Sequence, residues 1–364
     1  MQLSPNTWLG QILAGETAAQ WQHWAVETAL ADELRAKAFG ITPENVGEVI
    51  QARSHLLRSV YPAFSQLCQT TLRLQPSQGL ETLWNLWLPL AMQLASYRKA
   101  QSAPFIQGIL GGQGTGKSTL AAILTLILSQ LGYRTLSLSL DDLYKTYSDR
   151  LALREQDPRL IWRGPPGTHD IQLGLTVLDR LRQPVRADLK LASTPTLIQV
   201  PRFDKSAWGG AGDRSQPEIV EGADIVLFEG WFVGVRPIDP AKFDTAPPPI
   251  VTPADQEFAR DMNAQLKDYL PLWERLDRLV LLYPVDYRLS QEWRQQAEQQ
   301  MIATGKSGMS DSEVEQFVKY FWRSLHPELF IKPLINNPSW VDLVIEINSD
   351  HSAGAVYQPG DARV

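Results

Sequence analysis

Residues 111–119 form a glycine-rich segment that reads Gly-Gly-Gln-Gly-Thr-Gly-Lys-Ser-Thr and follows the spacing G-x-x-x-x-G-K-S. Glycines let a loop curl tightly enough to aim several backbone N–H groups at one anion. In such a loop Lys117 places a positive charge beside the β- and γ-phosphates of a nucleotide, and the Ser118 hydroxyl can ligate Mg²⁺. The segment therefore predicts a site for ATP and Mg²⁺ made by Gly111, Gly112, Gly114, Thr115, Gly116, Lys117, Ser118 and Thr119.

The sequence on either side of this loop supports that interpretation. An apolar run at 105–110 predicts a buried strand before the loop, and apolar spacing over 119–131 predicts a helix after it. The N-terminus of that helix would point its positive dipole end at the phosphates. Residues 303–307 contain a second Gly-Lys-Ser, but Gln300 replaces the leading glycine and no strand precedes it. We interpret this second copy as an ordinary loop.

Acidic residues at the ends of predicted strands can supply the rest of a phosphoryl-transfer site. Asp141 and Asp142 follow a strand predicted at 134–140, which we expect to lie beside the strand that precedes the glycine-rich loop. A carboxylate there can accept the proton of an acceptor hydroxyl or hold Mg²⁺ through water, although an Asp pair can also simply cap a turn. Glu229 ends the apolar run at 225–228, the place of a carboxylate on the metal side of such sites. The candidate metal-binding residues are Ser118, Asp141 and Glu229.

Two loops carry charged side chains suited to a small anionic or hydroxylated substrate. The first, residues 163–170, reads Arg-Gly-Pro-Pro-Gly-Thr-His-Asp and leads into a predicted helix, so its charges gather at a helix N-terminus. The second, residues 203–214, contains glycines that let its backbone approach a ligand, with a lysine and an arginine able to pair with an anion. Each charge taken alone could instead be a helix cap or a solvated surface residue. The candidate substrate-binding residues are Arg163, His169, Asp170, Asp204, Lys205 and Arg214.

The helix predicted at 287–300 carries Arg288 and Arg294. An arginine on a mobile helix can close over a triphosphate and neutralise the charge that develops during transfer. The alternative, a polar face exposed to solvent, stays open for both residues. The catalytic candidates are Asp141, Lys117 and Arg294.

Two regions of different pattern divide the chain. Residues 1–100 show mainly helical spacing of apolar residues, which predicts an all-helical N-terminal region. Residues 101–364 alternate predicted strands and helices, which is typical of an α/β fold of the P-loop NTPase type, with a mainly parallel sheet flanked by helices. The strands predicted for this second domain are 105–110, 134–140, 193–200, 225–228, 279–283 and 341–347.

Composition argues against several classes of partner. A net charge of −6 and a pI near 5.5 do not suit binding to nucleic acid, which requires clustered basic surface. Cys68 is the single cysteine and excludes an intramolecular disulfide. The sequence shows no apolar run long enough to span a membrane, and its start resembles neither a secretory leader nor a transit peptide. We expect a cytoplasmic protein that acts on a small molecule, as a monomer or weak homo-oligomer, without nucleic acid or membrane.

The motifs taken together resemble one family. The sequence resembles D-glycerate 3-kinase of the plant and cyanobacterial type, which is similar in fold to phosphoribulokinase, uridine kinase and the P-loop pantothenate kinase. The resemblance covers residues 100–347 and implies ATP-dependent phosphorylation of D-glycerate on its 3-hydroxyl, a step of photorespiratory carbon recovery. It rests on 111–119, on Ser-Leu-Asp-Asp-Leu-Tyr at 139–144, on both charged loops, on Glu-Gly-Trp-Phe at 229–232 and on Trp-Arg-Gln-Gln-Ala-Glu at 293–298.

The resemblance also implies a role for one of the two neighbouring aspartates. In the related kinases an Asp that opens an Asp-x-Phe-Tyr motif is the proposed base, and this selects Asp141 over Asp142, although Leu143 replaces the aromatic residue. On the residues alone, two other functions stay open. One is a kinase of another small alcohol, such as uridine or pantothenate, and the other is a nucleotide-dependent switch ATPase whose helical N-terminal region binds a protein.

Overall fold

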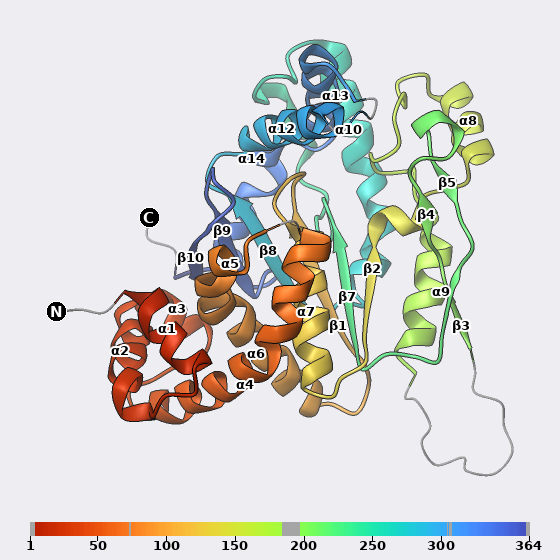
Figure 1. Cartoon of the computed structure of the whole chain (residues 1–364). Helices are drawn as coiled ribbons and strands as arrows, with labels where there is room; N and C mark the ends of the chain where they lie inside the picture. The colour runs from red at the N-terminus through yellow and green to blue at the C-terminus, as the bar shows by residue number, and fades with distance from the viewer. Residues whose placement is uncertain (1–3, 73, 184–196, 304, 306–307, 362–364) are drawn as a thin grey trace, which may run out of the picture.

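The computed structural model describes residues 4–72, 74–183, 197–303, 305 and 308–361, and it shows a central sheet with helices on both faces (Figure 1). The strands of this sheet are parallel, except that the edge strand β10 runs antiparallel to β9. The predicted α/β fold with a mainly parallel sheet is therefore confirmed. In sheet order the strands are β10 (Ala353–Tyr357), β9 (Leu343–Ile347), β8 (Arg278–Pro284), β1 (Phe105–Gly111), β7 (Ile225–Gly230) and β2 (Thr135–Ser139).

The strand order corrects one prediction. Asp141 follows β2, but β2 does not lie beside β1, because β7 is hydrogen bonded to both strands. Glu229 of β7 is in register with Ile109 of β1 and with Ser139 of β2. Chain order does not fix strand order in a sheet with crossover connections, and a wholly apolar run is typical of a strand buried on both faces. Glu229 is thus carried on the strand between the glycine-rich loop and Asp141.

Two further strands differ from the sequence expectation. The strand predicted at 341–347 is not the last strand of the sheet, because β10 adds an antiparallel edge strand beyond it. The Ala-Gly-Ala-Val-Tyr sequence of β10 has low β-strand propensity, so it was not predicted. The strand predicted at 193–200 is observed as β3 (Ile198–Val200), which pairs with β6 (Glu218–Val220) outside the main sheet. Residues 193–196 of that prediction, and residues 306–307 of the second Gly-Lys-Ser, lie outside the described residues.

The all-helical N-terminal region packs on one face of the sheet, where Figure 1 shows it in red and orange. Its helices α4 and α6 contact α7 (Lys117–Gln130), the helix that follows the glycine-rich loop, and one hydrophobic core includes Trp84, Leu124 and Ile109. The predicted helical character is confirmed, whereas a domain boundary at residue 100 stays a prediction. The helices of this region are α1 (Pro5–Leu13), α2 (Ala18–Ala31), α3 (Glu33–Ala38), α4 (Val46–Leu67), α5 (Pro76–Thr82) and α6 (Leu88–Lys99).

A second hydrophobic core fills the other face. Side chains alternate along a strand, so Phe105 and Ile109 of β1 enter the first core while Ile106 and Leu110 enter the second. Among the described residues, no helix is both long and apolar enough to cross a membrane. The helices of the second domain include α8 (Tyr147–Gln156), α9 (Ile171–Leu181), α10 (Pro253–Gln265), α12 (Leu289–Ala303) and α13 (Asp311–Ser324).

Candidate active site

The glycine-rich loop joins β1 to α7, as the sequence predicts. Gly114 and Gly116 have φ values of +79° and +84°, a region that side chains other than glycine rarely adopt. A Cβ on Gly114 would lie 2.7 Å from Cβ of Trp293, because α12 packs directly against the loop. The glycines here are thus required both by backbone conformation and by the close approach of a neighbouring helix.

Lys117, Ser118 and Glu229 converge beside this loop. The Ser118 hydroxyl donates to Oε1 of Glu229 at 3.2 Å, and Glu229 is buried. Burial lowers the pKa of Lys117, while the nearby carboxylates of Glu229 and Asp141 act in the opposite direction. A hydroxyl and a carboxylate are oxygen donors of the kind Mg²⁺ prefers, and Mg²⁺ commonly takes its other ligands from phosphate and water. These residues therefore fit a Mg²⁺–nucleotide site.

Asp141 lies in the short 3₁₀ helix η3 (Leu140–Leu143), which begins where β2 ends. Its Oδ2 is 2.6 Å from the Lys205 ammonium, which comes from the 203–214 loop. Burial alone would raise the pKa of Asp141, but Lys205 and a hydrogen bond from Tyr144 outweigh it and lower that pKa. Asp141 is thus ionised at neutral pH, which is the state that can accept a proton.

Asp142 is held in a different way from its neighbour. Its Oδ2 accepts hydrogen bonds from the Ser139 backbone at 3.0 Å and from the Arg202 guanidinium at 2.8 Å. Both contacts fix the turn that follows β2. The geometry thus gives Asp142 a structural role and supports the choice of Asp141 that the family resemblance implied.

Tyr144 and His169 stack beneath Asp141, with ring centroids 4.6 Å apart. His169 Nδ1 is 2.7 Å from the Tyr269 hydroxyl, and the His169 side chain is buried. Burial lowers the pKa of His169 to about 3, so the ring is neutral at physiological pH. Sequence reasoning placed His169 among the substrate-binding residues; the structure stacks it on Tyr144, and its role in substrate binding stays a prediction.

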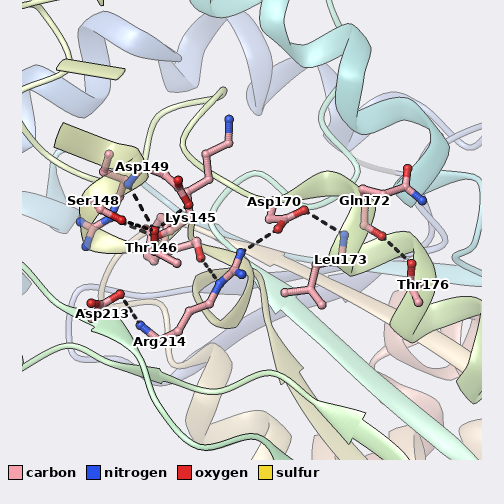
Figure 2. A network of polar contacts seen from close by, with 12 residues as sticks. Lys145, Thr146, Ser148, Asp149, Asp170, Gln172, Leu173, Thr176, Asp213 and Arg214 are labelled. Carbon is pink, nitrogen blue, oxygen red and sulfur yellow. Dashed lines mark hydrogen bonds and ion pairs between the residues drawn. The ribbon is translucent and has the colours of Figure 1, made fainter. Parts of the chain in front are cut away.

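Arginine side chains lock the two charged loops together. Arg163 donates to the carbonyl oxygens of Gly210 and Ala211 at 2.7 and 2.9 Å. Arg214 donates to Oδ2 of Asp170 at 2.8 Å and to the Tyr144 carbonyl at 3.0 Å, and Figure 2 shows Asp170 between Arg214 and the helix α9. The other oxygen of Asp170 caps α9 by accepting from the Leu173 N–H at 2.9 Å. Arg163, Asp170 and Arg214 thus join the two loops, and their role in substrate binding stays a prediction.

Asp204 does not join this cluster. Its Oδ1 accepts from the N–H and hydroxyl of Ser206 at 2.8 and 2.6 Å, and the side chain is exposed. The residue starts the turn of the hairpin formed by β4 (Phe203–Asp204) and β5 (Asp213–Arg214). The structure thus gives Asp204 a turn-capping contact, and its predicted role in substrate binding stays a prediction.

Arg294 lies on α12, next to the tryptophan that covers the glycine-rich loop. It forms an ion pair with buried Glu298 and lies 5.3 Å from the centre of the Phe317 ring. Glu298 also accepts a hydrogen bond from the Met309 N–H at 3.0 Å, so it ties α12 to the segment before α13. A catalytic role for Arg294 stays a prediction. Arg288 pairs with Asp286 instead.

Sequence reasoning missed two cations beside the site. Arg150 of α8 donates to the carbonyls of Ala211 and Lys145 at 2.8 and 3.1 Å, and thereby holds the hairpin against the chain that follows Asp141. The Lys145 ammonium has no ion pair or hydrogen bond among the described residues, and Figure 2 shows it at the end of an extended side chain. The only sequence signal for Lys145 was its position directly after the Asp-Asp-Leu-Tyr motif.

The fold and site together are those of a P-loop kinase: a glycine-rich phosphate loop, a metal-side carboxylate and an ionised aspartate at the carboxyl edge of a parallel sheet. No protein-family model matches the chain. The chain is 29% identical over 338 residues to the chloroplastic D-glycerate 3-kinase of Arabidopsis thaliana, an alignment that covers 86% of this chain and 69% of that protein.

Two further relatives agree with this comparison. The uncharacterized kinase mug58 of Schizosaccharomyces pombe is 30% identical over 262 residues, which cover 69% of this chain and 91% of mug58. The solved structure of D-glycerate 3-kinase from Cryptococcus neoformans var. grubii superposes with a TM-score of 0.64 at 28% identity, over 74% of this chain and 96% of that one. The chain belongs to the family of P-loop kinases that includes mug58 and the plant D-glycerate 3-kinase.

Proposed function

We propose that this protein transfers the γ-phosphoryl group of ATP to the 3-hydroxyl of D-glycerate and forms 3-phosphoglycerate. The observation that carries the proposal is the Asp141 carboxylate, held ionised beside Lys205 on the same edge of the sheet as Lys117 and Glu229. A small hydroxy acid needs a base for its hydroxyl and a cation for its carboxylate. The names of the plant and fungal relatives support D-glycerate as that acid.

The chain's own residues would divide the work as follows. The 111–119 loop holds the phosphates, and Lys117 neutralises charge near the γ-phosphoryl group. Ser118 and Glu229 would hold Mg²⁺, which neutralises charge on the triphosphate when bound. Asp141 accepts the proton of the attacking hydroxyl as the new O–P bond forms and the bond to the β-phosphate oxygen breaks.

The contacts of the candidate cations separate their roles toward the substrate carboxylate. Arg214 donates from Nε to the Tyr144 carbonyl and from one terminal nitrogen to Asp170, and these two anchored contacts assign it to positioning the loop. Lys205 is more than half exposed and pairs only with Asp141 among the described residues. Arg163 uses one terminal nitrogen on the hairpin carbonyls, and its other terminal nitrogen makes no hydrogen bond or ion pair in the described chain, although the guanidinium lies over the Tyr144 and Phe203 rings. We assign binding of the substrate carboxylate to Lys205 and Arg163.

The test is an assay of phosphate transfer from Mg·ATP to D-glycerate. We expect turnover with D-glycerate, detection of the product by an enzyme specific for 3-phosphoglycerate, and no turnover with uridine or pantothenate. Turnover with one of those alcohols but not with D-glycerate would show that the substrate is a different alcohol, and the protein would still be a kinase. ATP hydrolysis without transfer to any of them would favour the switch ATPase. The photorespiratory context, the cytoplasmic location and the oligomeric state stay predictions.

A further inference from the structure

A cavity of about 180 Å³ lies where the N-terminal helices, the sheet and the C-terminal segment meet. Arg278 begins β8 and Asp342 directly precedes β9, so the cavity is at the amino edge of the sheet. The glycine-rich loop follows the opposite, carboxyl end of β1. The cavity is therefore separate from the kinase site. The polar residues that line it are Gln93, Tyr97, Gln107, Arg278, Asp342 and Gln358.

Gln107 is a polar residue on the apolar face of the central strand. It lies between Phe105 and Ile109, which both enter the first hydrophobic core, and its side chain is only 2% exposed. Its Nε2 donates to the Gly108 carbonyl at 2.8 Å, whereas its Oε1 has no donor among the described residues. This oxygen is open to the cavity and not sealed in the core, and it takes its hydrogen bond from whatever occupies the cavity. Because Gln107 lines the cavity, a molecule inside the cavity can supply it.

The remaining lining groups define what such a molecule looks like. Gln93 donates Nε2 to the Ala38 carbonyl at 3.1 Å, which leaves its own Oε1 as an acceptor. Arg278 pairs with Asp342 and lies 5.0 Å over the ring of Tyr97, whose hydroxyl makes no hydrogen bond in the described chain. The lining thus combines one cation and one anion with amide and hydroxyl groups. It has no net charge, which suits a neutral or zwitterionic ligand better than an anion such as a nucleotide.

We propose that this cavity binds a small zwitterion of the α-amino acid class, with its carboxylate on Arg278 and its ammonium on the Gln107 Oε1 and Asp342. A cavity of roughly 150 Å³ is known to hold benzene, so this one holds a molecule of about six or seven non-hydrogen atoms, the size of alanine or serine. Glycerate is an anion and not a zwitterion, so we assign it to the kinase site and not to this cavity. The proposal does not depend on the kinase activity.

The experiment is isothermal titration of the full chain, without nucleotide, with L-alanine and L-serine. Lactate, which carries a hydroxyl in place of the ammonium, and ethylamine, which lacks the carboxylate, are the matched probes. We expect both amino acids to bind and both probes to bind at least about tenfold more weakly. Gln107→Leu and Arg278→Gln should each weaken binding about tenfold or more, because each removes one anchoring group. Arg260→Gln removes another Asp-paired arginine, on α10 outside the cavity, and should change nothing.

Three outcomes would overturn the proposal. The absence of binding by either amino acid up to about 10 mM would show that the cavity holds only solvent. Equal binding of lactate and alanine would show that the ammonium is not recognised. Unchanged binding in both variants would place the amino acid elsewhere. Gln107→Leu removes the single hydrogen bond of this amide to the Gly108 carbonyl and keeps a side chain of similar size, so it should fold; if it does not, Arg278→Gln at an exposed position provides the same test.

Discussion

The Lys205 ammonium lies 2.6 Å from Oδ2 of Asp141, although the two residues belong to separate loops. This contact keeps the Asp141 carboxylate ionised, which is the state required of a general base. The same contact occupies Oδ2, one of the two carboxylate oxygens that can accept the proton of a hydroxyl. Lys205 is more than half exposed, so it can turn from Asp141 to the carboxylate of an arriving substrate. Substrate binding would therefore free the Asp141 carboxylate from its ion pair with Lys205.

Asp141→Asn should lower kcat for phosphate transfer by about 10²- to 10⁴-fold, because asparagine cannot accept the proton. The affinity for ATP, measured by titration with a fluorescent nucleotide, should stay within about twofold, since the phosphate loop is not altered. Asp142→Asn is the matched control. It weakens the Arg202 and Ser139 contacts, so we expect lower stability with most of kcat retained. Equal losses of kcat in the two variants would contradict the assignment of Asp141.

Lys205→Met should shift the acid limb of the pH–activity profile to higher pH. Lys205 lowers the pKa of Asp141 against the effect of burial, so its loss raises that pKa. Asp141 then becomes protonated earlier as the pH falls, and activity is lost at a higher pH than in the native protein. The KM for glycerate should rise as well. Lys145→Met removes a neighbouring cation that affects the pKa of Asp141 less than Lys205 does, so an equal shift in that variant would refute the explanation.

Glu229→Gln should raise the Mg²⁺ concentration needed for half-maximal activity by about 10- to 100-fold. The substitution keeps the shape of the side chain and its contact with Ser118, but removes the negative charge that a cation requires. The measurement is a Mg²⁺ titration of the rate at fixed ATP. Glu221→Gln changes an exposed carboxylate near the same strand and serves as the control. Identical Mg²⁺ curves for Glu229→Gln and the native protein would remove Glu229 from the metal site.

Gly114→Ala should abolish measurable ATP binding. Its φ of +79° strains any side chain, and the new Cβ would meet Trp293 at 2.7 Å. Gly132→Ala tests the strain of a positive φ without a clash, because Gly132 has a φ of +84° and no atom lies within 4 Å of an added Cβ. The control should cost about 1–3 kcal/mol of stability, measured by chemical denaturation, and leave ATP affinity unchanged. If both variants bind ATP normally, the contact between α12 and the loop is not important for nucleotide binding.

His169→Phe should make the stability of the protein less sensitive to acid. The pKa of His169 falls from 6.5 to about 3 on folding, so the unfolded chain binds the proton more readily. Native stability therefore decreases as the pH falls below about 6.5, and the decrease from this residue amounts to roughly 2–3 kcal/mol by about pH 4.5.

The phenylalanine has no proton to gain, so the denaturant midpoint of His169→Phe should fall less steeply over this pH interval. It should start lower at neutral pH, because the hydrogen bond to Tyr269 is lost. His23 is mostly exposed, so His23→Gln should keep the native acid dependence. The same slope in all three proteins would show that His169 is not neutral in the folded state.

Features that are encoded locally could be predicted from the residues alone. Five residues separate Gly111 from Lys117, and this spacing between a strand and a helix is enough to specify a phosphate loop. The apolar run before Glu229 specified a buried strand with a carboxylate at its end. Alternation of strands and helices specified the α/β class, and the motifs pointed to the kinase family to which the chain belongs.

Which of these residues and elements come into contact depends on the folding of the whole chain. Strand order results from crossover connections and packing over the whole chain, so the insertion of β7 between β1 and β2 could not be predicted from the order of the strands. The contacts of Lys205 with Asp141 and of Arg294 with Glu298 depend on how loops and helices fold back on the sheet. The burial of His169 and the cavity beside Gln107 arise in the same way. Residue type tells what a side chain can do, and the packing around it decides its partners.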